Sequence, residues 1–553
     1  MNRSTFLPGK RAWKLFTLTL VFIHFNVYGQ DAFNYFCRVY FRDKGANTEL
    51  SYSSSDLLSI RAIDRRSKSG ITAPDYRDLP VFKGYIDQIK ELGFTFHCTS
   101  KWMNTALFRT KFSPDTALLK SLPFVADAKI VKKPIGKSLY YNKLDLISDA
   151  EDLPPFDRPL TMMHGDVLHS SGYDGTGVLI AILDAGFTNA DIVSSLSNLR
   201  NRNGIKYTWD FVNNDQSVYN YHYHGTAILS VLAGVSEGYI QGTAPGADFI
   251  LLRTEDASSE FSVEEDFWTA AAEFADSAGA DIISSSLGYF NFDEPSLNYK
   301  FSDLDGNTAF VTRAADIAAS KGILVVCSAG NERNNTWKHI LVPSDGDSVL
   351  SIGAVDGNGV ISSFSSAGPS SDGRVKPDNT AMGVSVIAQT ELSSFVRMNG
   401  TSLSCPVLSG MAASLKQADP NATNIEIINA LHRAGDRFSV PDTLYGYGTP
   451  DMIKALDYLQ ELHLKLPEKG TLTWPNPTTG EFEINFRDSP GSLVIEIYTS
   501  SGSLIFRKDF PDYAGRNIAL QVLSGKPQGI YLIKLKTGKG TFVNKIIKLN
   551  DLR

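Results

Sequence analysis

The stretch Val178-Leu179-Ile180-Ala181-Ile182-Leu183-Asp184 indicates the fold of this 553-residue chain. Its first six residues are all apolar, and such an unbroken run is typical of a strand in a parallel sheet covered on both faces. Asp184 follows directly, at the carboxyl end of the predicted strand. Because open α/β sheets place their ligand sites at that end, the stretch predicts an α/β domain with a functional carboxylate.

A second motif begins at His224 and continues as Gly225-Thr226-Ala227-Ile228-Leu229-Ser230-Val231-Leu232-Ala233-Gly234. These small and apolar residues favour a helix that starts at or just after His224 and ends at Gly234. A lone aspartate at a strand end, or a lone histidine at a helix start, is more often structural than catalytic. The third motif decides between these interpretations.

That third motif is Asn399-Gly400-Thr401-Ser402-Leu403-Ser404-Cys405-Pro406, which leads into apolar residues at helical spacing. It predicts a buried helix with Ser402 in its first turn, beside unpaired backbone N–H groups and the positive end of the helix dipole. An isolated serine there would be an ordinary N-cap residue. The order Asp184, His224, Ser402, however, is the order of the catalytic triad in subtilisin.

These motifs resemble those of the subtilisin-like serine proteases, the subtilase family, over about residues 160–460. Ile182–Gly186 resembles the aspartate motif of the family, His224-Gly225-Thr226 the histidine motif, and Gly400–Pro406 the serine motif. Ser328-Ala329-Gly330-Asn331 resembles its Ala-Ala-Gly-Asn segment. Departures such as Ala185 for threonine and Cys405 for threonine or serine remove no catalytic group.

The resemblance implies a role for each matched residue. Asp184, His224 and Ser402 would form the triad, and the Asn331 side chain would help to form the oxyanion hole. Substrate would lie against two segments, Ser286-Leu287-Gly288 and Ala329-Gly330. The chemistry fits these residue types, because a serine hydroxyl needs a base to remove its proton, and the base needs a partner that orients it.

Composition excludes several other classes of function. The net charge of −7 and the pI of about 5.8 give no general attraction to nucleic acid. Nine histidines without a His-Glu-x-x-His pattern argue against a metallohydrolase. Four cysteines are too few for a disulfide scaffold, and Cys327 and Cys405 are expected to be buried thiols. No cofactor is expected for the chemistry. The sequence does not decide whether calcium is bound, since the acidic loop Asp303–Asn307 suits either a calcium site or a solvated turn.

The residues before the protease-like region suggest export and inhibition. Residues 1–29 carry a positive start and the short apolar stretch Leu15–Phe25, as a signal peptide does. Residues 30–133 alternate predicted strands with a helix over Val81–Leu92 and resemble an inhibitor-like subtilase propeptide. Residues 134–158 are expected to be a linker and processing region, followed by the peptidase domain over 159–462.

The residues after Leu466-Pro467 predict a separate β-sandwich over 468–553. Five strand-like runs are separated by the turn signals Thr479-Gly480, Ser501-Gly502 and Thr537-Gly538. Pro475–Gly480, Gly529-Ile530-Tyr531 and Lys545-Ile546-Ile547-Lys548 resemble the type A sorting domain of the type IX secretion system. The resemblance implies recognition by outer-membrane secretion machinery, and the alternative is a carbohydrate-binding or adhesive sandwich.

The sequence as a whole predicts an exported serine endopeptidase with an α/β catalytic domain, an α+β propeptide and a small all-β sandwich. Its partners would be protein or peptide substrates, its own propeptide and the secretion machinery, with a secreted or cell-surface location. The alternative from a different class is a catalytically silent subtilase fold that serves as a binding scaffold. Cleavage specificity and oligomeric state do not follow from the residues.

Overall fold

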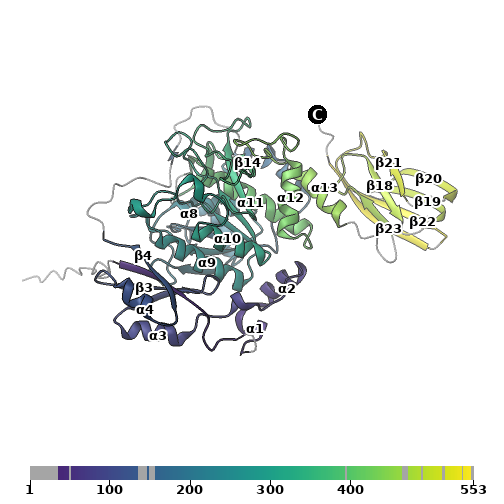
Figure 1. Ribbon diagram of the computed structural model, residues 1–553. Coiled ribbons are helices and arrows are strands. Elements are labelled where there is room, and N and C mark those ends of the chain that lie inside the picture. The colour runs from purple at the N-terminus through teal and green to yellow at the C-terminus, as the bar shows by residue number, and fades with distance from the viewer. Residues whose placement is uncertain are drawn as a thin grey trace, which may run out of the picture.

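The computed structural model describes residues 35–549 apart from 49–50, 135–145, 148–155, 391, 393–394, 464–470, 487–489, 514–516 and 539. Figure 1 shows three units: an N-terminal unit against one side of a large central unit, and a C-terminal unit of strands beyond helix α13. The expected signal peptide, residues 1–29, lies outside the described residues. The expected fold class, an α/β domain between an α+β unit and a small β-sandwich, is confirmed.

The N-terminal unit is built on an antiparallel sheet in the order β2-β3-β1-β4. Alternate residues of β1 and β3 pack on α3 and α4, as expected for a sheet with helices on one face. The elements are β1 (Tyr35–Phe41), α1 (Ser54–Leu57), α2 (Ile60–Lys68), η2 (Tyr76–Asp78), α3 (Lys83–Glu91), β2 (Thr95–Ser100), β3 (Thr105–Thr110), α4 (Thr116–Ser121) and β4 (Val125–Lys132).

The central unit contains a seven-stranded sheet in the order β14-β13-β12-β11-β6-β10-β7, in which all pairs are parallel. Its strands are β6 (Leu179–Asp184), β7 (Ile205–Asp210), β10 (Asp248–Arg253), β11 (Ile282–Ser285), β12 (Leu324–Ser328), β13 (Val349–Val355) and β14 (Asn379–Met382).

Both faces of this sheet are covered, which explains the unbroken apolar run of β6. Ile180 and Ile182 belong to the core that includes helices α8 (His224–Ala233) and α11 (Thr401–Ala418). Ala181 and Leu183 belong to the opposite core with helices α9 (Val263–Ala278) and α10 (Phe310–Ser320). Successive residues of a strand point to opposite faces, so the positions of β6 before its terminal Asp184 are all apolar.

Shorter elements complete the central unit and connect its layers. They are β5 (Leu146–Ile147), α5 (Arg158–Thr161), α6 (Gly165–Ser170), η3 (Ser194–Leu196), α7 (Ser197–Asn201), β8 (Val235–Ser236), β9 (Ile240–Gln241), η4 (Pro295–Leu297), η5 (Phe301–Asp303), β15 (Val386–Gln389), β16 (Phe395–Asn399), α12 (Asn424–Ala434) and α13 (Met452–Leu462).

The C-terminal unit consists of two antiparallel sheets that share one apolar core, as expected for a sandwich. Its described residues form two strands more than the five predicted runs, namely β17 (Thr471–Trp474) and β23 (Gly540–Lys548). The sheets are β17-β18-β21 and β20-β19-β22-β23, formed by β17 (Thr471–Trp474), β18 (Phe482–Phe486), β19 (Gly491–Thr499), β20 (Leu504–Tyr513), β21 (Asn517–Leu520), β22 (Gly529–Thr537) and β23 (Gly540–Lys548).

Two features differ from the sequence-based expectation. The predicted linker, residues 134–158, includes strand β5, which pairs antiparallel with β16 just before Ser402. The N-terminal unit also contains α1, α2 and η2 between β1 and α3, where no element was predicted. Helix α2 was missed because its residues are mostly charged, and its two buried arginines follow no apolar periodicity.

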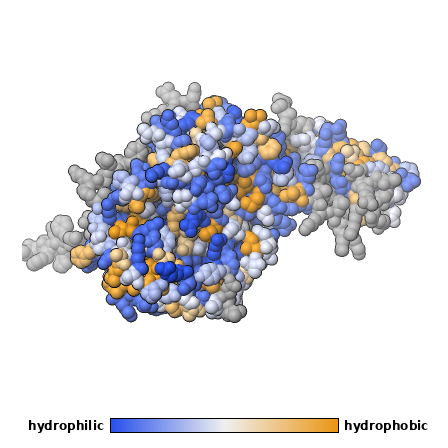
Figure 2. All heavy atoms as spheres, viewed as in Figure 1, coloured by the Kyte–Doolittle hydropathy of each residue, from blue (hydrophilic) through white to orange (hydrophobic). Residues whose placement is uncertain are grey.

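Hydrophobic and hydrophilic side chains are mixed on the face of the molecule seen in Figure 2. In the face shown in Figure 2, hydrophobic side chains occur in small separate areas and hydrophilic side chains cover most of the rest. Within the described ranges, no helix is both long and apolar enough to cross a bilayer.

Candidate active site

The candidate site lies at the carboxyl ends of three neighbouring strands, β12, β11 and β6. Asp184 ends β6, Ser286 follows β11, and Ala329 follows β12. Parallel strands end at one edge of a sheet, so residues far apart in the sequence meet there. The predicted site residues therefore come together through the strand order.

Asp184 and His224 form a buried pair. His224 Nδ1 lies 2.9 Å from Asp184 Oδ1 and 3.0 Å from Oδ2, and both side chains are completely buried. His224 is the first residue of α8, as its sequence motif predicted. Asp184 Oδ1 also accepts a hydrogen bond from the N–H of Ala185, which fixes the carboxylate. The imidazole is thus held by its Nδ1 side in one orientation.

Ser402 is the second residue of α11, directly after Thr401, and is almost fully buried. The hydroxyl of Ser286 donates a hydrogen bond of 2.8 Å to the Ser402 carbonyl oxygen. This contact ties the turn that carries Ser402 to the end of β11. Ser286 was expected to bind substrate, and its side chain here positions Ser402.

Asn331 and Ser402 face the same small space. A Cβ atom placed on Gly400 would lie 3.4 Å from Ser402 Oγ and 3.5 Å from Asn331 Nδ2. Gly400 has φ of 151°, a conformation that favours glycine. A Cβ at this position would touch both the hydroxyl and the amide, so Ser402 Oγ and Asn331 Nδ2 lie near each other.

Thr401 determines how the Asn331 amide is oriented. Asn331 Oδ1 accepts hydrogen bonds from the Thr401 N–H at 2.9 Å and from the Thr401 hydroxyl at 3.0 Å. The same hydroxyl accepts from the N–H of Gly330 at 3.1 Å. Because a backbone N–H can only donate, the amide oxygen must face Thr401 and Nδ2 must face the other way. Sequence reasoning missed this role of Thr401, although its place next to Ser402 was a signal.

The two segments expected to bind substrate enclose Leu341. A Cβ on Gly288 would lie 2.7 Å from Leu341 Cβ, and a Cβ on Gly330 would lie 2.6 Å from Leu341 Cγ. The Leu341 N–H also donates to the carbonyl oxygen of Ala329 at 3.1 Å. The Leu341 side chain thus fills the space between the two glycines, and no sequence motif marked it. Leu287, the remaining residue of these segments, is buried.

The cysteines near the site are buried thiols. Cys327 and Cys405 are both completely buried, and all four cysteines of the chain lie in described residues and are free. Burial raises the pKa of the Cys405 thiol to about 11. A thiol that stays protonated is a poor nucleophile, so Cys405 is not expected to react.

Carboxylates that could hold a cation occur at two places. In the loop Asp303–Asn307, the Asp305 carboxylate accepts hydrogen bonds from the N–H groups of Asn307 and Thr308, which is the arrangement of a turn. Glu255, Glu260 and Glu264 bring carboxylate oxygens within 4.8 Å of one another. Tyr289 donates to Glu255, and the Asp256 N–H donates to Glu264. Asp305, Glu255 and Glu264 thus already have donors of the chain itself as partners.

Comparisons with known proteins assign a family to each of the three units. Residues 175–448 match the subtilase family, residues 37–143 match the peptidase S8 propeptide domain of Bacteroidota, and residues 472–549 match the secretion system C-terminal sorting domain.

Among similar curated proteins, the thermophilic serine proteinase of Bacillus sp. (strain AK1) is 29% identical over 287 residues, 51% of this chain and 62% of that protein. Subtilisin Savinase of Lederbergia lenta is 28% identical over 290 residues, 52% of this chain and 94% of the relative. Thermitase of Thermoactinomyces vulgaris is 29% identical over 290 residues, 52% of this chain and 90% of the relative. The alignment covers less than two thirds of the first protein and nearly all of the other two.

Proposed function

From the premise that this chain is a secreted serine protease of the subtilase family, we propose that Asp184, His224 and Ser402 are its catalytic residues. The observation that carries the proposal is the buried contact between Asp184 and His224 Nδ1 at 2.9 Å. A proton held at Nδ1 by Asp184 makes Nε2 the basic nitrogen of the ring. The reaction is hydrolysis of a peptide bond in a protein or peptide substrate.

Acylation begins when Ser402 Oγ attacks the carbonyl carbon of the substrate. A carbon–oxygen bond forms, the hydroxyl proton moves to His224 Nε2, and negative charge develops on the former carbonyl oxygen. When the carbon–nitrogen bond breaks, His224 gives this proton to the departing amine. A water molecule then attacks the acyl-enzyme with His224 again as base, which releases the acid and restores the Ser402 hydroxyl.

The oxyanion would be bound by Asn331 Nδ2 and by the N–H of Ser402. The orientation of the amide, anchored by Thr401 through Oδ1, supports this role for Nδ2. The Ser402 N–H lies in the first turn of α11, where a backbone N–H has no partner within the helix. Donors fixed before the reaction stabilise charge that appears only in the transition state. The mechanism uses only groups of this chain and needs no cofactor.

Substrate would lie against Ser286–Gly288 and Ala329–Gly330, with Leu341 between the two segments. The Leu341 side chain occupies space that a large substrate side chain would need. We therefore expect a preference for small side chains next to the cleaved bond.

The propeptide would be the first substrate of the enzyme. Strand β5 pairs Leu146 with Asn399 and Ile147 with Met398, and it runs antiparallel to β16. Since β16 leads towards Ser402, Leu146 is the end of β5 nearer to Ser402. A bond attacked there would leave Leu146 on the amine side. N-terminal sequencing of the mature enzyme should find its first residue at or within about three residues before Leu146, and a start beyond Ile147 would contradict the proposal.

A serine-reactive organophosphonate probe tests the nucleophile. The mature enzyme should be labelled at Ser402, and Ser402→Ala should be unlabelled and lose about 2 × 10⁶ in kcat, the loss found when subtilisin loses its serine. The matched control is Ser296→Ala, which removes an exposed hydroxyl outside the site and should keep both labelling and turnover. Normal turnover by a folded Ser402→Ala protein would refute the assignment.

Export would depend on both ends of the chain. The C-terminal sorting domain indicates secretion by the type IX system, and residues 1–29 would act as the signal peptide. Deleting the chain from Glu468 onward should leave peptidase activity intact and should retain the protein in the periplasm. Normal secretion of the truncated protein would refute the role of the sorting domain.

A further inference from the structure

The N-terminal unit docks along one face of helix α9 from its first turn to its last. Asp266 accepts two hydrogen bonds from Arg38, both at 2.7 Å. About two turns further along, Glu273 accepts from the Ser100 hydroxyl at 2.6 Å. Asp276 binds arginines of α2 at the other end. Positions 266, 273 and 276 lie on one helical face, which therefore forms an acidic receiving surface.

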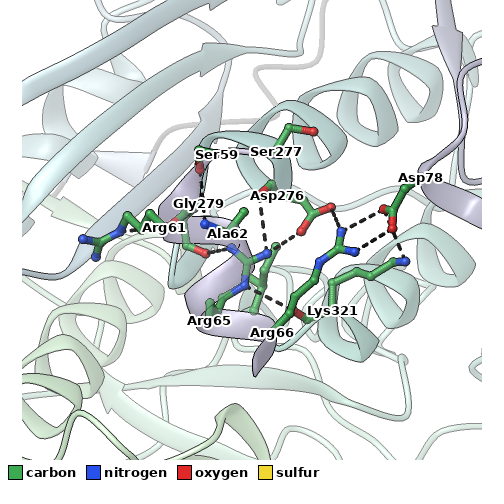
Figure 3. A network of polar contacts seen from close by, with 12 residues as sticks. Ser59, Arg61, Ala62, Arg65, Arg66, Asp78, Asp276, Ser277, Gly279 and Lys321 are labelled. Carbon is green, nitrogen blue, oxygen red and sulfur yellow. Dashed lines mark hydrogen bonds and ion pairs between the residues drawn. The ribbon is translucent and has the colours of Figure 1, made fainter. Parts of the chain in front are cut away.

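The contact at the last turn of α9 is made by a segment that the four-stranded sheet does not require. We define residues 51–79, which contain α1, α2 and η2, as the strap. Figure 3 shows Arg65 and Arg66 of the strap helix α2 directed at Asp276, whereas Arg61 points away from it. Both carboxylate oxygens of Asp276 are engaged, Oδ1 by Arg65 and Oδ2 by Arg66 at 2.6 Å.

The network extends beyond this one carboxylate. Arg66 also binds Asp78 of the strap through two hydrogen bonds of 2.6 and 2.8 Å. Lys321, which follows α10, lies 3.4 Å from Asp78 Oδ1. The side chains of Arg66, Asp78 and Asp276 are completely buried, and that of Lys321 is 1% exposed. Lys321 also lies 2.5 Å from Asp75 Oδ2 of the strap. The three cations Arg65, Arg66 and Lys321 thus meet the three carboxylates of Asp75, Asp78 and Asp276 in one network.

The strap also forms hydrogen bonds with backbone carbonyl groups of the central unit. Arg61 donates to the carbonyl oxygens of Gly279 at 2.9 Å and of Gly177 at 2.7 Å. Gly279, with φ of 94°, ends α9, and a Cβ on it would lie 2.7 Å from Arg61 Cβ. Only glycine allows both this backbone conformation and the close approach of α2. The receiving surface is therefore shaped for the strap.

This docking surface is remote from Ser402. Gly177 precedes β6, Gly279 precedes β11 and Lys321 precedes β12, so the strap covers the amino ends of strands whose carboxyl ends form the site. A six-residue strand such as β6 separates the two edges by about 20 Å. Occupation of the strap surface needs no contact with the substrate-binding segments.

We propose that the strap is a second docking segment that keeps the propeptide bound to the catalytic domain after the chain between them has been cut. Cleavage turns an intramolecular contact into a bimolecular one, and a second rigidly linked contact lowers the dissociation rate. A charged surface suits this purpose, because it stays soluble once the propeptide is finally lost, whereas an apolar surface would be left exposed. The inference rests on the proposed function. Its test, however, measures release of the propeptide and does not require Ser402 to be the nucleophile.

The test uses the full chain with Ser402→Ala and a recognition sequence for a site-specific protease inserted between residues 140 and 141. After cutting, the release of the N-terminal fragment is measured by gel filtration and by its dissociation rate from the immobilised remainder. Arg65→Gln with Arg66→Gln should speed release by about 100-fold or more, because removing one side of a buried ion pair leaves the other uncompensated. Asp276→Asn should do the same from the other side of the boundary.

The matched control is Arg77→Gln, which removes an exposed arginine of the same strap. It should leave the release rate unchanged.

Arg61→Ala is a milder variant for the case that the double variant does not fold, because the Arg61 side chain is 40% exposed. We expect about tenfold faster release from it. Equal release rates for Arg61→Ala, Asp276→Asn and the unsubstituted fragment would overturn the proposal. A lower yield of folded chain with unchanged release would assign the network to folding and would overturn it too.

Discussion

The two edges of the central sheet both bury charged side chains, and they use different ones. The carboxyl edge pairs one carboxylate, Asp184, with the imidazole of His224. The amino edge matches Arg65, Arg66 and Lys321 with Asp75, Asp78 and Asp276. In the proposed mechanism the His224 imidazole gains and loses a proton in each cycle, whereas a guanidinium keeps its charge at every physiological pH. The proposed reactive edge thus uses a group that changes charge, and the proposed docking edge uses groups that keep theirs.

The largest effect is expected when the charge of Asp184 is removed from the carboxyl edge. Asp184→Asn should lower kcat by about 10⁴-fold, because the amide would favour the wrong imidazole tautomer. The variant keeps its shape, so thermal unfolding should confirm a folded protein. Steady-state kinetics on a peptide substrate measure the effect. A loss below about tenfold would mean that Asp184 is structural.

A second variant tests the proposed oxyanion site at the same edge of the sheet. Asn331→Ala should lower kcat by about 10²–10³-fold with little change in KM, since Nδ2 would meet charge that exists only in the transition state. Asn334→Ala, at an exposed position three residues away, is the control. A variant changed chiefly in KM would point to substrate binding instead.

Leu341 tests whether the carboxyl edge also selects substrates. Leu341→Ala opens space between Gly288 and Gly330, so kcat/KM for a phenylalanine next to the cleaved bond should rise about tenfold relative to alanine. Leu462→Ala, at an exposed position on α13, is the matched control. Paired peptides that differ in this one side chain provide the measurement. An unchanged ratio would show that Leu341 does not line the substrate pocket.

The smallest effect is expected at the amino edge when the pH is lowered. Burial alone would raise the pKa of the Asp78 carboxyl, but hydrogen bonds from Arg66 and the Asp75 N–H, with the charge of Lys321, lower it well below its usual range. A carboxyl with a lowered folded-state pKa stabilises the folded contact fully above its unfolded value of about 4, and loses this effect only as the pH falls further.

The cut Ser402→Ala chain should therefore keep its N-terminal fragment from pH 7 down to about pH 5. Gel filtration at each pH gives the readout, and the Arg61→Ala variant shows whether a partly exposed contact behaves alike. Release of the fragment between pH 7 and pH 5 would mean that another titrating group controls docking.

Local sequence patterns were sufficient to place the elements that carry the proposed reactive groups. The apolar run of β6 requires a sheet covered on both faces, and Asp184, His224 and Ser402 each stand at the start or end of an element that their own neighbours specify. Such patterns are short-range, so they can be recognised without knowing the fold. The helix at His224 and the strand before Asp184 were predicted to within about one residue, well inside the usual uncertainty of element ends.

The docking edge and the fine geometry of the site depended on the tertiary structure. Arg66 and Asp276 are 210 residues apart, and nothing near either one indicates that they meet. Thr401 and Asn331 are 70 residues apart, and Leu341 reaches the substrate-binding segments only because β11 and β12 are neighbours. The sequence by itself determined which groups could react and which elements carry them, because both follow from local periodicity. Only the tertiary structure decided which charges are buried against each other, because burial depends on the order in which strands and units pack.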